Sequence, residues 1–538
     1  MPFAVLEAPT GYGKTASGAL VFKEVEEYGL ASGYLHVLPL RAIVDDLYSK
    51  LLECRLPGID SSWLRSHGIG YQMMDYIEGR EADKSPYFLR EIIATTFDSF
   101  IYNLARLPIA ELGRRARHYE IPRSSILTSL IVFDEAHLYG GDLGLRDVKM
   151  FSVLLSSVRA LARLGVPTIV ESATLPSSVT SSLLNAMNSR TKAHFRLSKS
   201  DGSWDREYAE LHEQITWVTE QIGYDEVLER AFEHYESGEK VLVIFNNPGN
   251  AIDFYLKAIK RYFDEGRLAL LHGRLISGDR SKAYRKLKRL YDSKDGIMLV
   301  STQVIEAGVD ISFDVLFTEA APPTVLTQRA GRIARYGGPL TARVYVFEVG
   351  ERGGGVYDEE VVEETIEALK RKQVEWRLPE DRDEMISYRN LTEAIYSKFP
   401  QFRSMANGDI KLEKAITHPM ITNQHLNKLL VAYCGLVREP LLTGYVARQD
   451  EVSGVDELDP SRFIVLGKEL ARRLALNDLL HMDDGMVIAL RRRPEGGFEP
   501  RKLNPSIFNN CKKLFEYASD TILLVRDSAY REGLGIVL

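Results

Sequence analysis

The chain has 538 residues, which is too long for a single hydrophobic core and suggests about three domains. Its 68 basic and 75 acidic residues leave a net charge of −7, so a nucleic-acid partner would need a local basic groove on an otherwise acidic surface. Three widely spaced cysteines exclude a cysteine metal cluster and fit a reducing cytoplasm, and no apolar run is long enough to cross a membrane. We therefore expect a cytoplasmic protein without a membrane contact.

A phosphate-binding loop is predicted almost at the start of the chain. Residues 8–15 read APTGYGKT and lie between an apolar strand at 3–6 and an amphipathic helix at 14–28. A strand, a glycine-rich turn and a helix in this order are the context that such a loop requires. The alternative is a chance match, because Ala8 stands where the pattern usually has glycine.

The residue types in this loop suit the phosphates of a nucleotide bound with Mg²⁺. Two glycines let backbone N–H groups point inward around a phosphate at a helix N-terminus. A lysine can reach the terminal phosphates, and the threonine after it can ligate Mg²⁺. The candidate nucleotide ligands here are Thr10, Gly11, Gly13, Lys14 and Thr15, with Thr15 also a metal ligand.

Two later strand ends carry candidate contacts to a nucleic-acid backbone. Arg41 follows an apolar strand at a strand-to-helix turn, and Thr95 and Thr96 end the strand predicted at 91–95. Such turns line the carboxyl edge of an open parallel sheet, where ligands bind. Arginine, hydroxyl and backbone amide groups suit contacts with phosphate. The alternative for Arg41 is a surface arginine at the start of a helix.

A pair of acids ends the strongly apolar strand predicted at 129–133. The sequence continues as Asp-Glu-Ala-His, in which Asp134 would hold Mg²⁺ and Glu135 would polarise the attacking water. A buried apolar strand fixes two carboxylates near a phosphate site. We include His137 among the nucleotide-binding candidates, and the alternative is a pair of solvated acids at a strand end.

The next apolar strand, at 167–171, ends in Ser-Ala-Thr. In this position the hydroxyls of Ser172 and Thr174 could hydrogen-bond the acidic motif when nucleotide is bound. We therefore predict that these two residues couple the bound nucleotide to the acidic motif. Alone, such a tripeptide carries no meaning.

A second α/β unit follows a polar linker predicted near 198–215. From residue 240 strands and helices alternate again, which predicts another parallel sheet, but without a phosphate loop of its own. The motif that points to a function in this unit is the run QRAGRIAR at 328–335. On a helix Gln328, Arg332 and Arg335 would share one face, which could look at an anion.

The ordered set of motifs over residues 1 to about 350 resembles the superfamily 2 DExH-box helicases, in which ATP binds between two RecA-like domains. The resemblance implies that Lys14, Thr15, Asp134 and Glu135 bind and hydrolyse ATP with Mg²⁺. It also implies that Arg332 and Arg335 act as arginine fingers, because a planar fork matches phosphate oxygens. Further residues carried over are Gln328 for catalysis, Gly308 and Asp310 for the nucleotide, and His272, Arg274, Thr302 and Gln303 for the nucleic acid.

Within that superfamily the chain resembles the stand-alone helicase of CRISPR type I interference. The residues that carry this resemblance are the Asp-Glu-Ala-His box and the runs 38–47, 302–310 and 328–335. The resemblance implies a single-stranded DNA translocase that unwinds target DNA and works with a CRISPR RNA-guided surveillance complex. None of the 11 histidines is followed by Asp, so we expect a separate HD-type nuclease to degrade the DNA.

The expected architecture is α/β, with two tandem RecA-like parallel-sheet domains and a C-terminal accessory domain. The C-terminal part shows no chemical motif, although His481, Asp483 and Asp484 could assemble an unrecognised metal site. The predicted units are 1–205, the first RecA-like domain; 206–350, the second; 351–390, a linker and helix; and 391–538, the accessory domain.

Two alternatives from other functional classes remain: another nucleic-acid motor, and a scaffold. An RNA helicase or a restriction-type translocase would share every motif, and a nucleotide-gated scaffold would not need the water-activating groups that this chain keeps.

Many superfamily 2 helicases read the adenine with a glutamine upstream of the phosphate loop. None of residues 1–7 is Gln, so we expect loose base selectivity.

Overall fold

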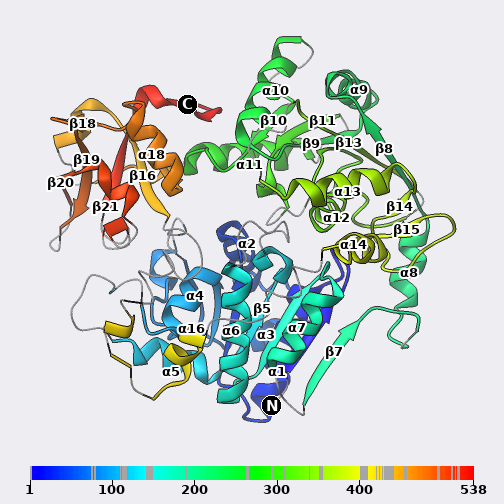
Figure 1. The fold of residues 1–538 in the computed structure, drawn as a ribbon, viewed down its shortest axis with the longest axis horizontal. Coiled ribbons are helices and arrows are strands. Elements are labelled where there is room, and N and C mark those ends of the chain that lie inside the picture. Colours follow the sequence, from blue (N-terminus) through cyan, green and yellow to red (C-terminus); the bar gives the residue numbers. More distant parts are fainter. Residues whose placement is uncertain are drawn as a thin grey trace.

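The computed structural model describes residues 3–537 apart from short internal gaps. These gaps are 74–76, 78–79, 109–110, 112–117, 141–148, 188–190, 201, 262–265, 292–295, 307–310, 339, 351–355, 400–409, 420, 423, 427, 429–440, 454–456, 494–496, 511–512, 515–516 and 518–520. Two α/β units and a smaller third unit follow one another along the chain (Figure 1).

The first unit is a seven-stranded sheet with the order β3-β4-β2-β5-β6-β1-β7, and every neighbouring pair is parallel. Ile131 and Phe133 of β5 belong to one hydrophobic cluster and Leu130 and Val132 to another, so both faces of the sheet are covered. The strands are β1 (Phe3–Glu7), β2 (Gly33–Leu38), β3 (Ile69–Gln72), β4 (Ile92–Thr96), β5 (Ser129–Phe133), β6 (Thr168–Ser172) and β7 (Lys192–Arg196). The helices are α1 (Lys14–Glu27), α2 (Arg41–Leu52), α3 (Ser61–Arg65), α4 (Phe97–Leu104), α5 (Glu120–Leu127), α6 (Lys149–Leu164) and α7 (Ser177–Met187).

The second unit is a six-stranded parallel sheet with the order β10-β11-β9-β12-β13-β8. The hydrophobic cluster on one face of the first sheet also contains Leu242 and Ile244 of β9, so the two sheets share a core. The strands are β8 (Ile215–Ile222), β9 (Lys240–Ile244), β10 (Leu268–Leu271), β11 (Ile297–Ser301), β12 (Val315–Glu319) and β13 (Leu340–Phe347). The helices are α8 (Arg206–Glu213), α9 (Tyr224–Glu236), α10 (Pro248–Arg261), α11 (Ser277–Tyr291) and α12 (Pro323–Ala330).

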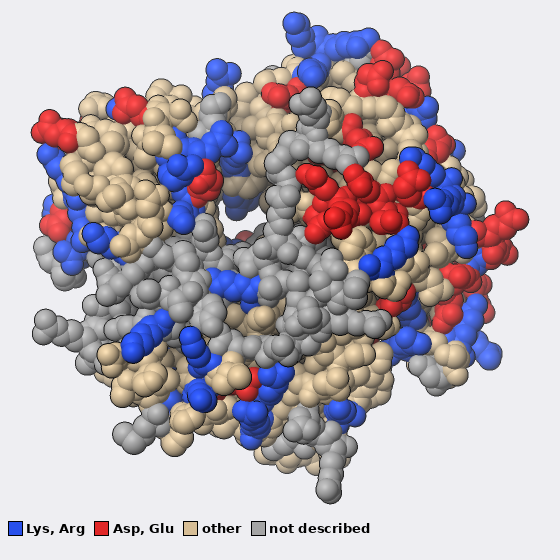
Figure 2. Space-filling model, viewed as in Figure 1, with Lys and Arg blue, Asp and Glu red and all other residues tan. Residues whose placement is uncertain are grey.

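The chain after β13 returns to the first unit. Helix α14 contacts α12, and α16 packs against α6 of the first unit (Figure 1). Acidic side chains gather over α13 on the face seen in Figure 2. The elements are α13 (Glu359–Leu369), β14 (Val374–Glu375), β15 (Ile386–Ser387), α14 (Tyr388–Tyr396) and α16 (Ile410–Thr417).

The third unit is a mixed sheet in which β17-β16-β21-β19-β18 are neighbours and β20 pairs with β19. It docks on α11: Ser277 Oγ donates to the backbone oxygen of Pro460 across 2.6 Å, and the Tyr530 hydroxyl donates to Asp279 across 2.8 Å. The elements are β16 (Leu442–Ala447), β17 (Phe463–Leu466), α18 (Lys468–Leu476), β18 (Met482–Asp483), β19 (Met486–Arg492), β20 (Phe498–Leu503), β21 (Thr521–Arg526), β22 (Tyr530–Arg531) and β23 (Gly535–Ile536).

Two parallel sheets and a C-terminal mixed sheet confirm the predicted fold class. The residue boundaries of the units stay a prediction.

The polar, glycine-dotted stretch 57–86 suggests an insertion or a long loop, but it holds α3 and the edge strand β3. A Cβ atom at Gly70 of β3 would lie 2.9 Å from the backbone oxygen of Asp83, so only glycine fits there. Because glycine is uncommon inside strands, the sequence pattern did not indicate β3. Among the described helices, none combines the length and the apolar character needed to span a bilayer.

Candidate nucleotide site between the two parallel sheets

The phosphate loop, residues 8–15, connects β1 directly to α1, as predicted. Gly11 has φ +81° and Gly13, the residue before α1, has φ +100°. Only glycine adopts these angles without strain, because it lacks a Cβ atom. The two glycines therefore set the backbone that faces a ligand at the N-terminus of α1.

Lys14 is buried and points back into its own loop. Its Nζ atom donates to the backbone oxygens of Ala8 at 3.0 Å and Pro9 at 3.1 Å. The adjacent Thr15 is half-buried at the start of the helix. A cation held by neutral carbonyl groups keeps its full charge for an anion.

Strand β5 delivers Asp134 to the same edge of the sheet. Asp134 Oδ2 lies 3.2 Å from Nε2 of His36, and Oδ1 accepts the backbone N–H of Glu135 across 2.7 Å. Burial opposes ionisation, but the bond from His36 and the nearby charge of Lys14 hold the pKa of Asp134 below its usual value. An ionised carboxylate at this position is a suitable Mg²⁺ ligand.

Glu135 has the chemistry of a general base. Burial, followed by the charge of Asp134, raises the pKa of Glu135 to about 7. Its Oε2 atom lies 3.5 Å from Nδ1 of His137 but has no hydrogen-bond partner among the described residues. A base is most effective when its pKa lies near the working pH.

The predicted coupling residues behave differently from each other. Nδ1 of His137 lies 3.2 Å from Oγ of Ser172, which also accepts the backbone N–H of Thr174 across 3.3 Å. Burial and the charge of Lys14 lower the pKa of His137 to about 3, so this imidazole is neutral at physiological pH. Ser172 thus contacts the acidic motif, while Thr174 Oγ1 is buried without a hydrogen-bond partner among the described residues.

Two buried residues of the site were missed from the sequence. His36 lies inside β2, and Glu171 lies in β6, where it accepts the hydroxyl of Ser17 across 2.7 Å. Burial and the charge of Asp134 raise the pKa of Glu171 well above its usual value. The available signal was a polar residue within an otherwise apolar strand, whereas the prediction considered strand ends alone.

The second sheet contributes the arginine loop, residues 331–335. The prediction of one helix face for Gln328, Arg332 and Arg335 was wrong, because α12 ends at Ala330. A Cβ atom at Gly331 would lie 2.9 Å from Cγ2 of Thr10, so this glycine allows the two loops to touch. A bridge between Ile333 and Phe313 then pulls the chain out of the helical path.

The arginine loop faces the phosphate loop. A Cβ atom at Gly11 would lie 3.9 Å from the Cγ and Nε atoms of Arg335. Arg332 is buried, and burial together with Arg335 lowers its pKa to about 10. Burial and Asp134 raise the pKa of Glu135, whereas Arg332 and Arg335 act in the opposite direction. The arginines therefore lie close to the candidate base.

The site fits ATP with Mg²⁺. Lys14, Arg332 and Arg335 supply positive charge for phosphates, and Thr15 with the ionised Asp134 supplies oxygen ligands for the metal. Gln328 Oε1 lies 3.5 Å from Oγ1 of Thr10 across the boundary between the two sheets, and its Nε2 has no hydrogen-bond partner among the described residues. The candidates Gly308 and Asp310 lie outside the described residues.

Several predicted nucleic-acid contacts are buried and bonded inside the fold. Thr95 Oγ1 donates to the backbone oxygen of Gln72 across 2.7 Å, and Thr96 caps α4. His272 is fully buried, and burial with the charge of Arg274 lowers its pKa to about 4.

The remaining candidates differ in their exposure. Thr302 is buried, and Gln303 Nε2 donates to the backbone oxygen of Asn246 across 2.8 Å. Arg41, Arg274 and Gln303 are partly exposed. Sequence placed these residues at strand ends but could not show which way their side chains turn.

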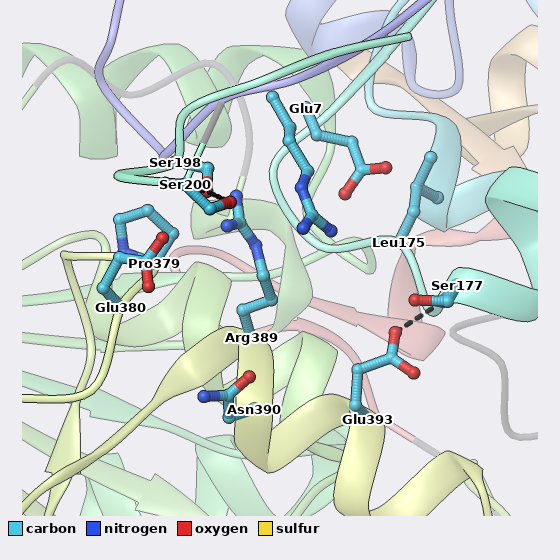
Figure 3. A pocket seen from close by; sticks show the side chains of 11 residues that line it. Glu7, Leu175, Ser177, Ser198, Ser200, Pro379, Glu380, Arg389, Asn390 and Glu393 are labelled. Atoms are coloured by element: carbon cyan, nitrogen blue, oxygen red, sulfur yellow. Dashed lines mark hydrogen bonds between the residues drawn. The ribbon is translucent and has the colours of Figure 1, made fainter. Parts of the chain in front are cut away.

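A separate polar pocket of about 160 Å³ lies at the end of β1, against α14 (Figure 3). Its groups are already paired: Glu7 accepts from Thr180 at 2.9 Å and lies 2.7 Å from Nε2 of His194. Glu393 of α14 accepts the backbone N–H of Ser177, as the dashed line in Figure 3 marks. The contact between Glu393 and Ser177 fastens α14 to the first unit.

The metal site considered at His481 and the two following aspartates is not assembled. Asp483 pairs with Lys502 at 2.5 Å, and His481 Nε2 faces the backbone oxygen of Ala447 at 3.3 Å. Within the described part of the chain, no group of three or more His, Cys, Asp or Glu residues could hold a metal ion.

Two families match the chain. The DEAD/DEAH box helicase family matches residues 3–182, which hold the phosphate loop and the acid pair. The C-terminal part of the CRISPR-associated nuclease/helicase Cas3 matches residues 237–338, which hold the arginine loop. The chain therefore holds one region similar to DEAD/DEAH box helicases and a second similar to the C-terminal part of Cas3.

Individual relatives show the same similarity. The CRISPR-associated nuclease/helicase Cas3 of Methanothermobacter thermautotrophicus is 26% identical over 392 residues, which cover 68% of this chain and 43% of the relative. The CRISPR-associated helicase Cas3 of Thermoproteus tenax is 26% identical over 380 residues, covering 68% and 59%. The chain thus spans about half the length of these curated relatives.

The crystal structure of T. fusca Cas3-ADP has a TM-score of 0.64 to this chain at 16% identity, covering 99% of this chain and 68% of that one. This likeness supports the fold alone.

Proposed function

We propose that the chain is an ATP-driven motor that moves along single-stranded DNA and unwinds target DNA in CRISPR type I interference. The observation that carries the proposal is the meeting of Lys14, Glu135 and Arg335 at one site, although they come from two different sheets. A site divided between two units links hydrolysis to their relative movement. The Cas3 relatives support the CRISPR assignment.

The residues divide the work by their chemistry. Lys14 binds the terminal phosphates, and Thr15 and Asp134 hold Mg²⁺, which neutralises phosphate charge. Glu135 accepts a proton from the attacking water. Arg332 and Arg335 stabilise the charge that develops in the transition state.

A DNA strand would pass between the three units. Figure 2 shows an opening near the centre of this face, with Lys and Arg gathered along its upper rim between the third unit and the second sheet. Burial and the charge of Arg473 in α18 lower the pKa of Arg274, so two cations lie close together beside α11. A local basic groove would offset the overall charge of −7.

The degradation step is assigned to a separate HD-type nuclease, recruited with the CRISPR RNA-guided surveillance complex. The test incubates the purified chain with ATP and a partial DNA duplex that carries a single-stranded tail, in Mg²⁺, Mn²⁺, Ni²⁺ or Co²⁺ in turn. We expect displacement of the paired strand without cleavage, and no displacement by Glu135→Gln. Cleavage that survives further purification and disappears in Asp483→Ala/Asp484→Ala would contradict the assignment.

A further inference from the structure

Arg377 belongs to the segment that follows the second sheet and is fixed to that sheet. Trp376 Nε1 donates to Thr219 Oγ1 of β8 across 3.0 Å. Gln373 accepts the backbone N–H of Thr219 at 2.7 Å and donates to its backbone oxygen at 3.0 Å. Arg377 therefore moves with the second unit.

The side chain of Arg377 reaches both loops of the candidate nucleotide site. Its Nη1 atom donates to the backbone oxygen of Thr10 in the phosphate loop across 2.8 Å. Its Nη2 atom donates to the backbone oxygen of Ile333 in the arginine loop across 2.9 Å. One planar guanidinium thus joins a loop of the first sheet to a loop of the second.

The surroundings of Arg377 differ from those of other buried arginines. Arg329 pairs with Glu306 at 2.8 Å, and Arg106 pairs with Glu120 at 3.2 Å. Arg377 is 1% exposed, and no carboxylate among the described residues pairs with it. Its Nε atom has no hydrogen-bond partner among those residues either.

A buried cation without a carboxylate is costly to a fold. Burial lowers the pKa of Arg377 and the charge of Arg335 acts in the same direction, whereas Tyr208 and the charge of Glu375 act in the opposite direction. The side chain lies beside the place where polyphosphate would bind: a Cβ atom at Gly11 would lie 3.7 Å from its Nη1. The cost argues for a role of Arg377 at the site rather than in stabilising the fold.

We propose that Arg377 is a positioning residue for ATP hydrolysis. It fixes the arginine loop against the phosphate loop, so that Arg332 and Arg335 meet the reacting phosphate. The arginine loop needs such support because α12 ends before it, and the backbone N–H of Arg335 donates to Ser312 Oγ across 3.1 Å instead of continuing a helix. The inference rests on the proposed ATPase and adds a residue outside the motifs that define it.

The test compares Arg377→Gln and Arg377→Lys with the unchanged chain in steady-state ATP hydrolysis. We expect kcat to fall about 10²-fold in both variants, because a small displacement of catalytic groups has this effect. Lysine should not rescue, since an ammonium cannot reproduce the planar fork that bonds two loops. Affinity for a non-hydrolysable ATP analogue should change by less than about threefold, because ground-state contacts remain.

A double variant separates positioning from simple destabilisation. If Arg377 acts through the arginine loop, combining Arg377→Gln with Arg335→Ala should cost little more than Arg335→Ala alone. The control is Arg389→Gln, which removes a similar bond to the first unit, from Nη1 to the backbone oxygen of Leu197 at 3.0 Å, outside the phosphate and arginine loops. We expect this control to hydrolyse ATP normally.

Three results overturn the inference: normal kcat in either Arg377 variant, losses that multiply fully in the double variant, or a loss confined to nucleotide affinity. If Arg377→Gln lowers the melting temperature, the lysine variant, which keeps the charge, supplies the same comparison. Absence of ATP hydrolysis in the unchanged chain would instead contradict the proposed function.

Discussion

Nζ of Lys14 donates to the backbone oxygen of Ala8 across 3.0 Å, which places the cation inside the phosphate loop, while Glu135 stands at the end of another strand. Replacing either residue should therefore have a different effect on nucleotide affinity and on turnover. Lys14→Ala should lose both nucleotide affinity and turnover, because it removes a phosphate contact. Glu135→Gln should keep affinity and lose turnover.

Nucleotide affinity and hydrolysis measured side by side on the two variants check this assignment. The isosteric amide in Glu135→Gln preserves shape, so it serves as a matched control for the loss of charge. Normal hydrolysis by Glu135→Gln would show that another group activates the water.

Arg335→Ala should slow hydrolysis severely and leave ATP binding nearly unchanged. An arginine that acts on transition-state charge contributes roughly 10³–10⁵ in rate. The control is Arg261→Ala on α10, where an exposed arginine pairs with Glu229 at 2.7 Å and such a pair contributes little. A loss below about tenfold for Arg335→Ala would identify a structural arginine.

The rate of ATP hydrolysis should depend on pH through Glu135. Burial raises its pKa to about 7, so the active, ionised form is lost as the pH falls through that value. Turnover at saturating ATP should rise with pH up to about 7 and then level off. A profile that stays flat between about pH 5.5 and pH 8 would contradict the role of Glu135 as the base.

Local patterns explain which parts of the site could be predicted. The strand, glycine turn and helix around Lys14 depend on neighbouring residues, and the structure has them as predicted. The acid pair follows a fully buried strand for the same reason. The order of motifs was enough to predict two parallel sheets.

Tertiary contacts explain what the sequence could not show. Helix α12 stops where Gly331 meets Thr10, a residue over 300 positions away in the chain. Arg377 reaches the same loops from a segment that carries no motif. The C-terminal mixed sheet is built from short strands that carry no recognisable motif. The sequence therefore could not predict the order of its strands.

The measurement that tests the central claim most directly is ATP hydrolysis by the purified chain with single-stranded DNA or with RNA of equal length and sequence, with Glu135→Gln as the background control. The account predicts that DNA stimulates hydrolysis strongly, that RNA does so weakly, and that the variant shows neither response. Equal or greater stimulation by RNA would contradict the DNA motor and favour an RNA helicase built on the same two sheets.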